Sequence, residues 1–188
     1  MKRIVVFASG TGSNFENIVT ELHQKQCEVA LLICDKQGAY CLERAVKLGI
    51  KYLVIEPSTF VSKSLYEQKI LEELVEIKPD LIVLAGYMRL IGPDLLTAYE
   101  GKIINIHPSL LPAFPGRDGI GDALAYGVKI MGITVHYVDA GIDTGQIIDQ
   151  LSFKRMGKDS KEEITAKIHE LEKELYPQVI KRLLSEEC

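Results

Sequence analysis

Two polar residues with complementary chemistry end a short apolar run. Asn105 and His107 are two positions apart, so on a strand their side chains project to the same face. That is the spacing required to pair a hydrogen-bond donor with a titratable group for acid–base chemistry. Asp143 stands in a later loop, and a carboxylate beside an imidazole favours its cationic form and orients it. A lone histidine is more often structural, and on the residues alone this alternative stays open.

A glycine-rich loop, Ser9-Gly10-Thr11-Gly12-Ser13-Asn14, follows the first apolar run. Glycines allow a ligand to approach the backbone, and the first N–H groups of the next helix can bind an anion, so the loop predicts a phosphate site. It is not a dinucleotide fingerprint, since Phe15 stands where the third glycine is needed, and it lacks the Gly-Lys-Ser/Thr ending of a Walker loop. The alternative is a plain turn in which Ser13 and Glu16 form a capping box.

His23, His136 and the cysteines indicate no further chemistry. His136 is interpreted as structural because strand alternation accounts for it, and His23 because it ends a surface helix. Four cysteines lack a C-x-x-C pair and metal-ligand spacing, so we expect free thiols, no metal site and a reducing, cytoplasmic compartment. They are Cys27, Cys34, Cys41 and Cys188.

Short apolar runs alternate with amphipathic stretches along the chain. Strands are predicted at 4–7, 29–33, 52–55, 81–84, 103–106 and 133–138, and helices at 14–23, 40–48, 64–77, 93–99, 121–126 and 161–184, the last with a capping box of Ser160 and Glu163. Nearly continuous apolar strands are covered on both faces, which predicts an α/β fold with a mainly parallel, doubly wound sheet flanked by helices. Ligands bind beyond the carboxyl ends of such strands, where all the polar loops above would meet.

Composition excludes several classes of protein. The chain has 188 residues, 47% hydrophobic and 26% charged, with a net charge of −4, which excludes a disordered protein and argues against a nucleic-acid partner. No run approaches the ~20 apolar residues that span a membrane, so we expect no membrane partner. Without linkers or repeats, residues 1–188 are expected to form a single domain.

Six motifs occur in order along the chain: the glycine loop, Leu84–Arg89, Asn105–Pro112, Gly132–His136, Asp143–Gly145 and Leu175–Pro177. With them the chain resembles the glycinamide ribonucleotide formyltransferases, folate-dependent enzymes of purine (IMP) synthesis, up to about Pro177. The resemblance implies a Rossmann-like formyltransferase domain. It also implies direct formyl transfer from 10-formyltetrahydrofolate, as cosubstrate, to the amine of 5-phosphoribosylglycinamide (GAR), without a metal.

The resemblance also implies roles for three groups of residues. In catalysis, Asn105 and protonated His107 would donate hydrogen bonds to the formyl oxygen, while Asp143 orients His107 and assists proton transfer. GAR and its phosphate would contact Gly12, Ser13, Asn14, His169 and Glu172. The folate would contact Lys63, Met88, Arg89, Leu90, Ile91, Asn105, Asp139, Ala140, Gly141, Ile142 and Asp143.

Three departures from the family pattern concern the loops. Lys63 stands where arginine is common, Gln146 where proline is common, and 115–121 lacks a histidine-containing segment. The resemblance further implies a cis Leu111–Pro112 bond and small-molecule partners, and we expect a monomer or a homodimer. We expect no room in 188 residues for the extra domains of methionyl-tRNA formyltransferase or formylfolate hydrolase. Two alternatives remain, a formyltransferase acting on a sugar amine and a non-catalytic folate- or nucleotide-binding module.

Overall fold

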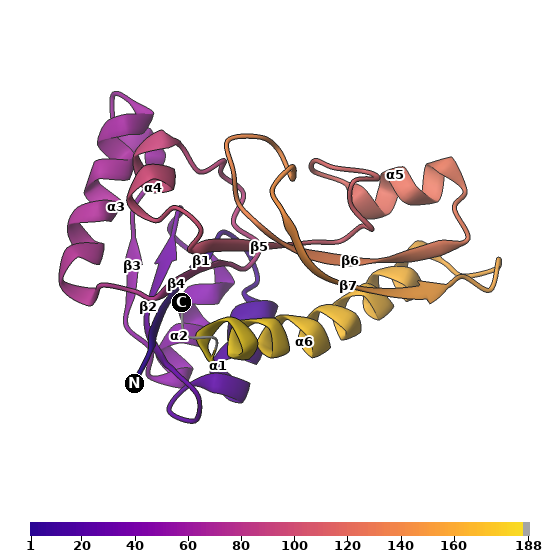
Figure 1. Cartoon of the computed structure of the whole chain (residues 1–188), viewed down its shortest axis with the longest axis horizontal. Coiled ribbons are helices and arrows are strands. Elements are labelled where there is room, and N and C mark those ends of the chain that lie inside the picture. Colours follow the sequence, from indigo (N-terminus) through magenta and orange to yellow (C-terminus); the bar gives the residue numbers. More distant parts are fainter. Residues whose placement is uncertain (186–188) are drawn as a thin grey trace.

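A seven-stranded sheet forms the centre of the molecule, with strands in the order β3-β2-β1-β4-β5-β6-β7 (Figure 1). The computed structural model describes residues 1–185, and Cys188 lies outside them. The strands are β1 (Arg3–Ala8), β2 (Glu28–Cys34), β3 (Tyr52–Val54), β4 (Leu81–Leu84), β5 (Ile103–His107), β6 (Ile130–Tyr137) and β7 (Ile147–Lys154). The helices are α1 (Ser13–Leu22), α2 (Tyr40–Leu48), α3 (Lys63–Ile77), α4 (Pro93–Ala98), α5 (Gly119–Tyr126) and α6 (Lys161–Ser185), with a short 3₁₀ helix, η1 (Pro57–Thr59).

The sheet is parallel from β3 through β5 and antiparallel from β5 through β7. The prediction of a mainly parallel sheet flanked by helices is therefore confirmed. The edge strand β7 was not predicted, because its residues alternate between exposed and half-buried instead of forming an apolar run. η1 was not predicted either, and β5 extends one residue further than expected, so that His107 belongs to the strand.

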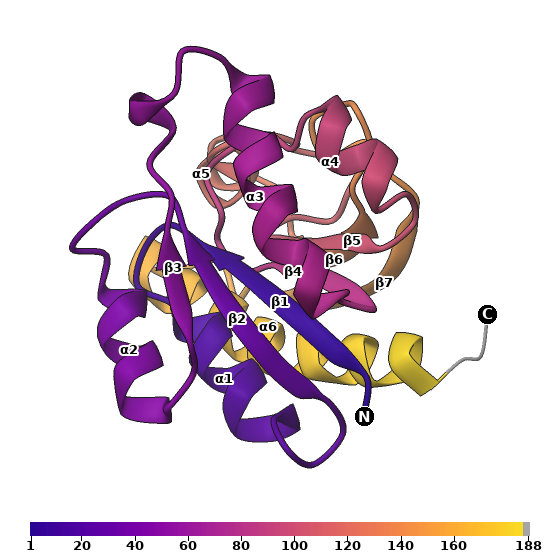
Figure 2. The ribbon, with the colours of Figure 1, turned by 90° about the vertical axis from the view of Figure 1, so that its left-hand side faces the viewer.

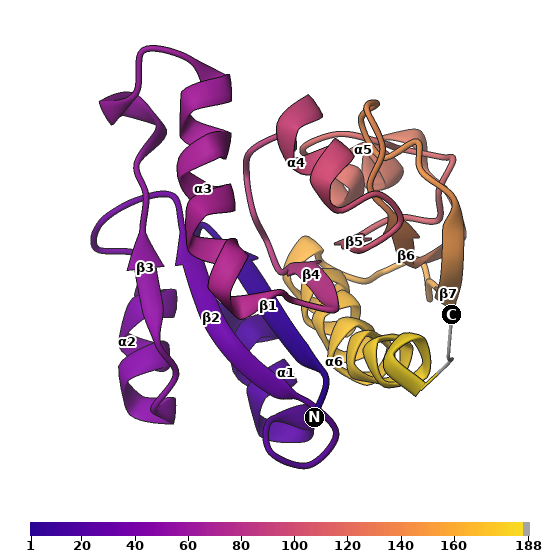
Figure 3. The same cartoon turned by 60° about the vertical axis from the view of Figure 1, so that its left-hand side comes forward.

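Helices cover both faces of the sheet and create two apolar cores. Alternate residues of β1 point to opposite sides, with Ile4 and Val6 in one core and Val5 and Phe7 in the other. The first core is shared with α1, α2 and α6, and the second with α3 and α4. Figures 2 and 3 show α1 and α2 on the face of the sheet opposite to α3. This double cover explains why β1, β2 and β4 are nearly continuous in apolar residues.

Several local predictions are confirmed. α2 spans the predicted residues, and the other helices begin or end within two residues of their expected bounds. The predicted capping box opens α6, where the N–H of Glu163 donates to Ser160 Oγ at 3.1 Å and the N–H of Ser160 donates to Glu163 Oε2 at 2.7 Å. The Leu111–Pro112 peptide bond is cis.

Tyr176 fastens the last helix to the centre of the sheet. Its side chain is fully buried, and its hydroxyl lies 2.8 Å from the carbonyl oxygen of Leu84 and 3.3 Å from that of Ile104. This contact fixes the position of α6 against β4 and β5. It therefore also fixes the turn of α6 just before Tyr176 relative to the ends of those strands. The same turn carries His169 and Glu172.

Candidate active site

A cleft of about 520 Å³ opens at the carboxyl ends of β1, β4 and β5. Its walls come from the loops that follow these strands, from the segment before α5, from the loop between β6 and β7 and from α6. The lining residues are 10–14, 84–91, 105–108, 116–117, 136, 138–139, 141–143, 169 and 172. The polar loops that the sequence analysis placed at one edge of the sheet thus share one cavity.

Asp143 lies between two imidazoles in this cleft. Its Oδ2 atom is 3.4 Å from His107 Nδ1, and its Oδ1 atom is 3.5 Å from His136 Nε2. The backbone N–H of Gly116 donates to Oδ2 at 2.8 Å and ties the carboxylate to the segment before α5. Asp143 adopts a left-handed backbone conformation with φ 54°, an uncommon geometry that Asp tolerates better than most residues.

Backbone carbonyls fix the proton on one nitrogen of each imidazole. His107 Nε2 lies 2.8 Å from the carbonyl oxygen of Phe114, and His136 Nδ1 lies 2.8 Å from that of Tyr137. A carbonyl oxygen only accepts, so both of these nitrogens carry hydrogen. The other nitrogen of each ring faces Asp143, and protonation there places an N–H toward the carboxylate.

Asn105 completes this group through its side-chain amide. Its Nδ2 atom lies 3.3 Å from His136 Nε2, which accepts a hydrogen bond when that imidazole is neutral. An amide nitrogen has two N–H groups, so Asn105 retains a second donor for a ligand. The structure therefore brings Asn105, His107 and Asp143 together, as predicted from their positions in the chain.

Opposing effects act on the Asp143 carboxyl, and their sum lowers its pKa. Burial alone would raise the pKa, but the hydrogen bond to His136, the Gly116 N–H and the charges of both imidazoles outweigh it. The carboxyl is consequently ionised at neutral pH and available to hold an imidazolium or to accept a proton.

His136 occupies a different place from the one expected for a purely structural histidine. It is buried in the strand and directly opposite Asn105 in the antiparallel β5–β6 register. Its Nε2 atom faces both Asn105 and Asp143, so His136 lies within the same group of side chains. Pairing the two predicted strands in antiparallel register could have revealed it, whereas strand alternation could not. His23 is structural as predicted, accepting the N–H of Val29 at its Nδ1 atom.

The glycine loop adopts a conformation that only glycine reaches without strain. Gly12 has φ 72° and immediately precedes α1, which begins at Ser13. The alternative of a capping box is wrong, because the helix has no side-chain cap and Glu16 pairs instead with Arg44. The helix N-terminus with its free N–H groups thus faces the cleft without a competing side chain.

A network from α6 reaches the glycine loop. Glu172 is buried, and its Oε2 atom accepts hydrogen bonds from Asn14 Nδ2 and His169 Nδ1, both at 3.0 Å. The hydrogen bond to Glu172 raises the pKa of His169 although partial burial opposes this. His169, Glu172 and the residues Gly12 to Asn14, all assigned by resemblance to GAR, therefore lie in one connected wall.

The side chains of Ser9, Asp35 and Glu67 hold the loop after β4. The N–H of Met88 donates to Ser9 Oγ at 2.8 Å, and Arg89 Nε donates to the buried Asp35 at 2.8 Å. The buried Glu67 accepts the N–H groups of Gly92 and Leu95 and so caps α4. Asp35 and Glu67 were not anticipated, because each meets partners distant in sequence. Their effect is to fix the loop that presents its apolar side chains to the cleft.

The residues assigned by resemblance to folate are distributed unevenly around this cleft. Most of them line it, namely Met88, Arg89, Leu90, Ile91, Asn105, Asp139, Gly141, Ile142 and Asp143. Ala140 belongs to the same loop but is not a lining residue. Lys63 opens α3 outside the lining, with its Cε atom 2.7 Å from where a Cβ on Gly92 would stand.

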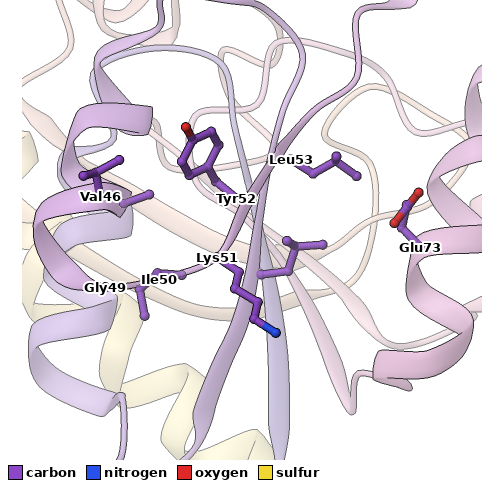
Figure 4. A pocket seen from close by; sticks show the side chains of 9 residues that line it. Val46, Gly49, Ile50, Lys51, Tyr52, Leu53 and Glu73 are labelled. Atoms are coloured by element: carbon purple, nitrogen blue, oxygen red, sulfur yellow. The ribbon is translucent and has the colours of Figure 1, made fainter.

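A second hollow, of about 530 Å³, lies away from this group at the edge of the sheet. It is lined by residues of β2, β3, α2 and α3, with Leu53 on the side of Glu73 and Tyr52 on the side of Val46 (Figure 4). It contains no histidine and none of the loops that follow the central strands. The chemistry of the site therefore points to the first cleft.

Comparison with known proteins agrees with this geometry. The family model described as formyl transferase matches residues 2–180. The chain belongs to the formyl transferase family. It is 54% identical over 186 residues to a protein of Bacillus subtilis (strain 168) named phosphoribosylglycinamide formyltransferase, covering 98% of this chain and 95% of that protein. A crystal structure described as glycinamide ribonucleotide transformylase 1 from Geobacillus kaustophilus matches with a TM-score of 0.95 and 51% identity, covering 98% of this chain and 100% of that one.

A longer relative contains the family domain within a larger protein. The trifunctional purine biosynthetic protein adenosine-3 of Drosophila melanogaster is 37% identical over 188 residues, which is 98% of this chain but 14% of that protein. A related formyl transferase domain is therefore one part of that longer protein.

Residues 1–185 contain no group of three or more His, Cys, Asp or Glu side chains arranged to hold a metal ion. None of the helices in that range is long and apolar enough to cross a membrane.

Proposed function

We propose that this formyl transferase moves the formyl group of 10-formyltetrahydrofolate to the amine of GAR. The observation that carries the proposal is the shared cleft, which holds an anion-binding helix start at Gly12–Asn14 and the group of Asn105, His107 and Asp143. The names of its relatives in Bacillus and Geobacillus support the same pair of substrates. The substrates are small molecules, and no metal takes part in the proposed reaction.

The proposed reaction is a direct acyl transfer. The GAR amine attacks the formyl carbon, the carbonyl electrons move to the formyl oxygen, and collapse of the tetrahedral intermediate expels N10 of the folate. Asn105 and protonated His107 donate hydrogen bonds to that oxygen, and Asp143 carries the amine proton toward the leaving nitrogen, directly or through water. A donor of this kind lowers the activation barrier by about 3–4 kcal/mol, which raises kcat roughly 10²–10³-fold.

The hydrogen bond of His107 to Phe114 bears on this mechanism. In the structure the Nε2–H of His107 donates to the Phe114 carbonyl, while its Nδ1 faces Asp143. For Nε2–H to reach the formyl oxygen, the segment that carries Phe114 has to release it. Asn105, by contrast, has a free N–H and can donate without such a rearrangement.

The test is formyl transfer by the purified protein from 10-formyltetrahydrofolate to GAR, followed by the absorbance of the folate product. We expect turnover, with at least a hundredfold lower kcat in Asn105→Ala. His23→Ala serves as the matched control because His23 lies outside the cleft, and it should retain turnover. Folate binding without transfer would contradict the proposal and favour a non-catalytic binding module.

A sugar-amine substrate is the nearest alternative within the family. The Gly12–Asn14 loop favours a substrate with a phosphate over one without. Comparing GAR with its 5′-dephosphorylated riboside decides between them, since equal kcat/KM for the two would remove the role of the loop. The remaining parts of the proposal are a cytoplasmic location, a single domain over 1–188 and a monomer or homodimer, without nucleic-acid or membrane partners.

A further inference from the structure

Arg117 is the feature of the cleft that the roles above leave unused. It follows Gly116 in the segment that departs from the family pattern, and both residues line the cavity. Its side chain is exposed, and among residues 1–185 it makes no ion pair and no side-chain hydrogen bond.

The backbone on both sides of Arg117 is fixed. The N–H of Gly116 donates to the Asp143 carboxylate at 2.8 Å. Asp118 caps α5 by accepting the N–H of Gly121 at 2.9 Å. Arg117 therefore projects from a backbone anchored to the catalytic carboxylate on one side and to a helix on the other. A flexible surface loop would not hold a guanidinium at the cleft in this way.

The charges of the cleft favour a role for this cation in binding anionic substrates. Three carboxylates line the cavity, those of Asp139, Asp143 and Glu172. Of the two lining arginines, Arg89 is bound to the buried Asp35. Apart from the histidines, Arg117 is therefore the uncommitted positive charge among the described residues of the lining.

We infer that Arg117 is a substrate-binding residue that forms a charge-assisted hydrogen-bonded pair with an anionic oxygen group of a substrate. The inference rests on the proposed function, in which GAR brings a phosphate and the folate brings the carboxylates of its glutamate tail. A guanidinium matches either group because its N–H donors form a planar fork.

Equilibrium binding to the Arg117→Met variant tests the inference. Calorimetry should show the Kd of one substrate raised at least about tenfold, because hydrogen bonds to charged groups contribute more than neutral ones. Arg117→Lys should recover part of the loss, since it restores the charge without the fork. Lys102→Met is the matched control, as it removes one positive charge outside the cleft lining.

Two pairs of ligands identify the anion. If the phosphate is the partner, Arg117→Met weakens GAR but leaves its 5′-dephosphorylated riboside unchanged. If the glutamate carboxylates are the partner, the variant weakens 10-formyltetrahydrofolate but not the analogue that lacks glutamate. Both outcomes support the inference.

Affinities for both substrates within twofold of Lys102→Met would overturn it. So would a loss of turnover with unchanged Kd values, because Arg117 would then act through the backbone segment. Turnover by the unmodified protein is measured separately, so a failure of the proposed reaction is distinguished from a failure of this assignment.

Discussion

Gly12→Ala tests the anion-binding loop by placing one methyl group at its tightest point. The new Cβ would stand 2.5 Å from Cys41 Cβ and 2.8 Å from Cys41 Cα, both parts of a buried residue. Because Gly12 has φ 72°, alanine also pays roughly 1–2 kcal/mol for the left-handed conformation. Overpacking adds about 1–3 kcal/mol. We expect the free energy of unfolding to fall by about 2–5 kcal/mol. If the loop moves instead and relieves the close contact, GAR binding should weaken about tenfold for each 1.4 kcal/mol of binding free energy that is lost.

The assays are urea denaturation and the KM for each substrate. The KM for GAR should rise more than that for the folate, because Gly12 directly precedes α1, whereas the loop after β4 is also held by Asp35 and Glu67, which lie outside the glycine loop. Gly10→Ala is the matched control in the same loop, since no heavy atom lies within 4 Å of its Cβ and its φ is not positive. If Gly12→Ala matched Gly10→Ala in both stability and affinity for GAR, the steric reasoning and the phosphate assignment would be refuted.

Two further predictions concern the carboxylate of Asp143 and the last helix. The folded-state pKa of Asp143 is lowered, so its ionisation stabilises the fold above the ordinary pKa of aspartate, and this stability is lost as the pH falls through the folded pKa. Denaturation between about pH 7 and about pH 3 should therefore show a steeper acid loss in the unmodified protein than in Asp143→Asn, and parallel curves would contradict the prediction. Tyr176→Phe removes the buried hydroxyl that donates to the carbonyl oxygens of Leu84 and Ile104, and it should lower the free energy of unfolding by about 1 kcal/mol, measured in urea. An unchanged midpoint would show that the hydroxyl contributes nothing.

The central strands could be predicted from sequence because burial on both faces selects apolar residues at every position. β1 and β4 are buried almost throughout, and their runs stand out. β7 lacks this signal because it is an antiparallel edge strand with alternating exposure. Its pairing with β6 depends on tertiary context, which a local pattern does not contain.

The site was predictable to the extent that it follows from topology. Asn105 and His107 lie at the carboxyl end of β5, which is parallel to β4, and ligands bind beyond such strand ends. Asp143 follows β6, which runs antiparallel to β5, so this rule does not explain how the loop returns Asp143 to the cleft. His136 also lies in β6, and only the β5–β6 register places it opposite Asn105. The sequence around Glu67 does not indicate that its side chain is buried, because its carboxylate oxygens accept backbone N–H groups that follow the next strand, including that of Gly92. A buried carboxylate of this kind is identified by the hydrogen-bond donors around it, and these donors are known only from the three-dimensional structure.

The hydrogen-bonded carbonyls around the two imidazoles explain why the carboxylate, and not either ring, sits at the centre of the site. His107 and His136 each have one nitrogen held by a backbone carbonyl, so neither ring can turn without losing that bond. Each ring can therefore exchange a proton with Asp143 through its remaining nitrogen only. A carboxylate that faces two such rings can hold one imidazolium while accepting a proton from a substrate amine, and its lowered pKa keeps it ionised for both tasks. Replacing either histidine should for this reason alter the pH dependence of kcat as well as its size.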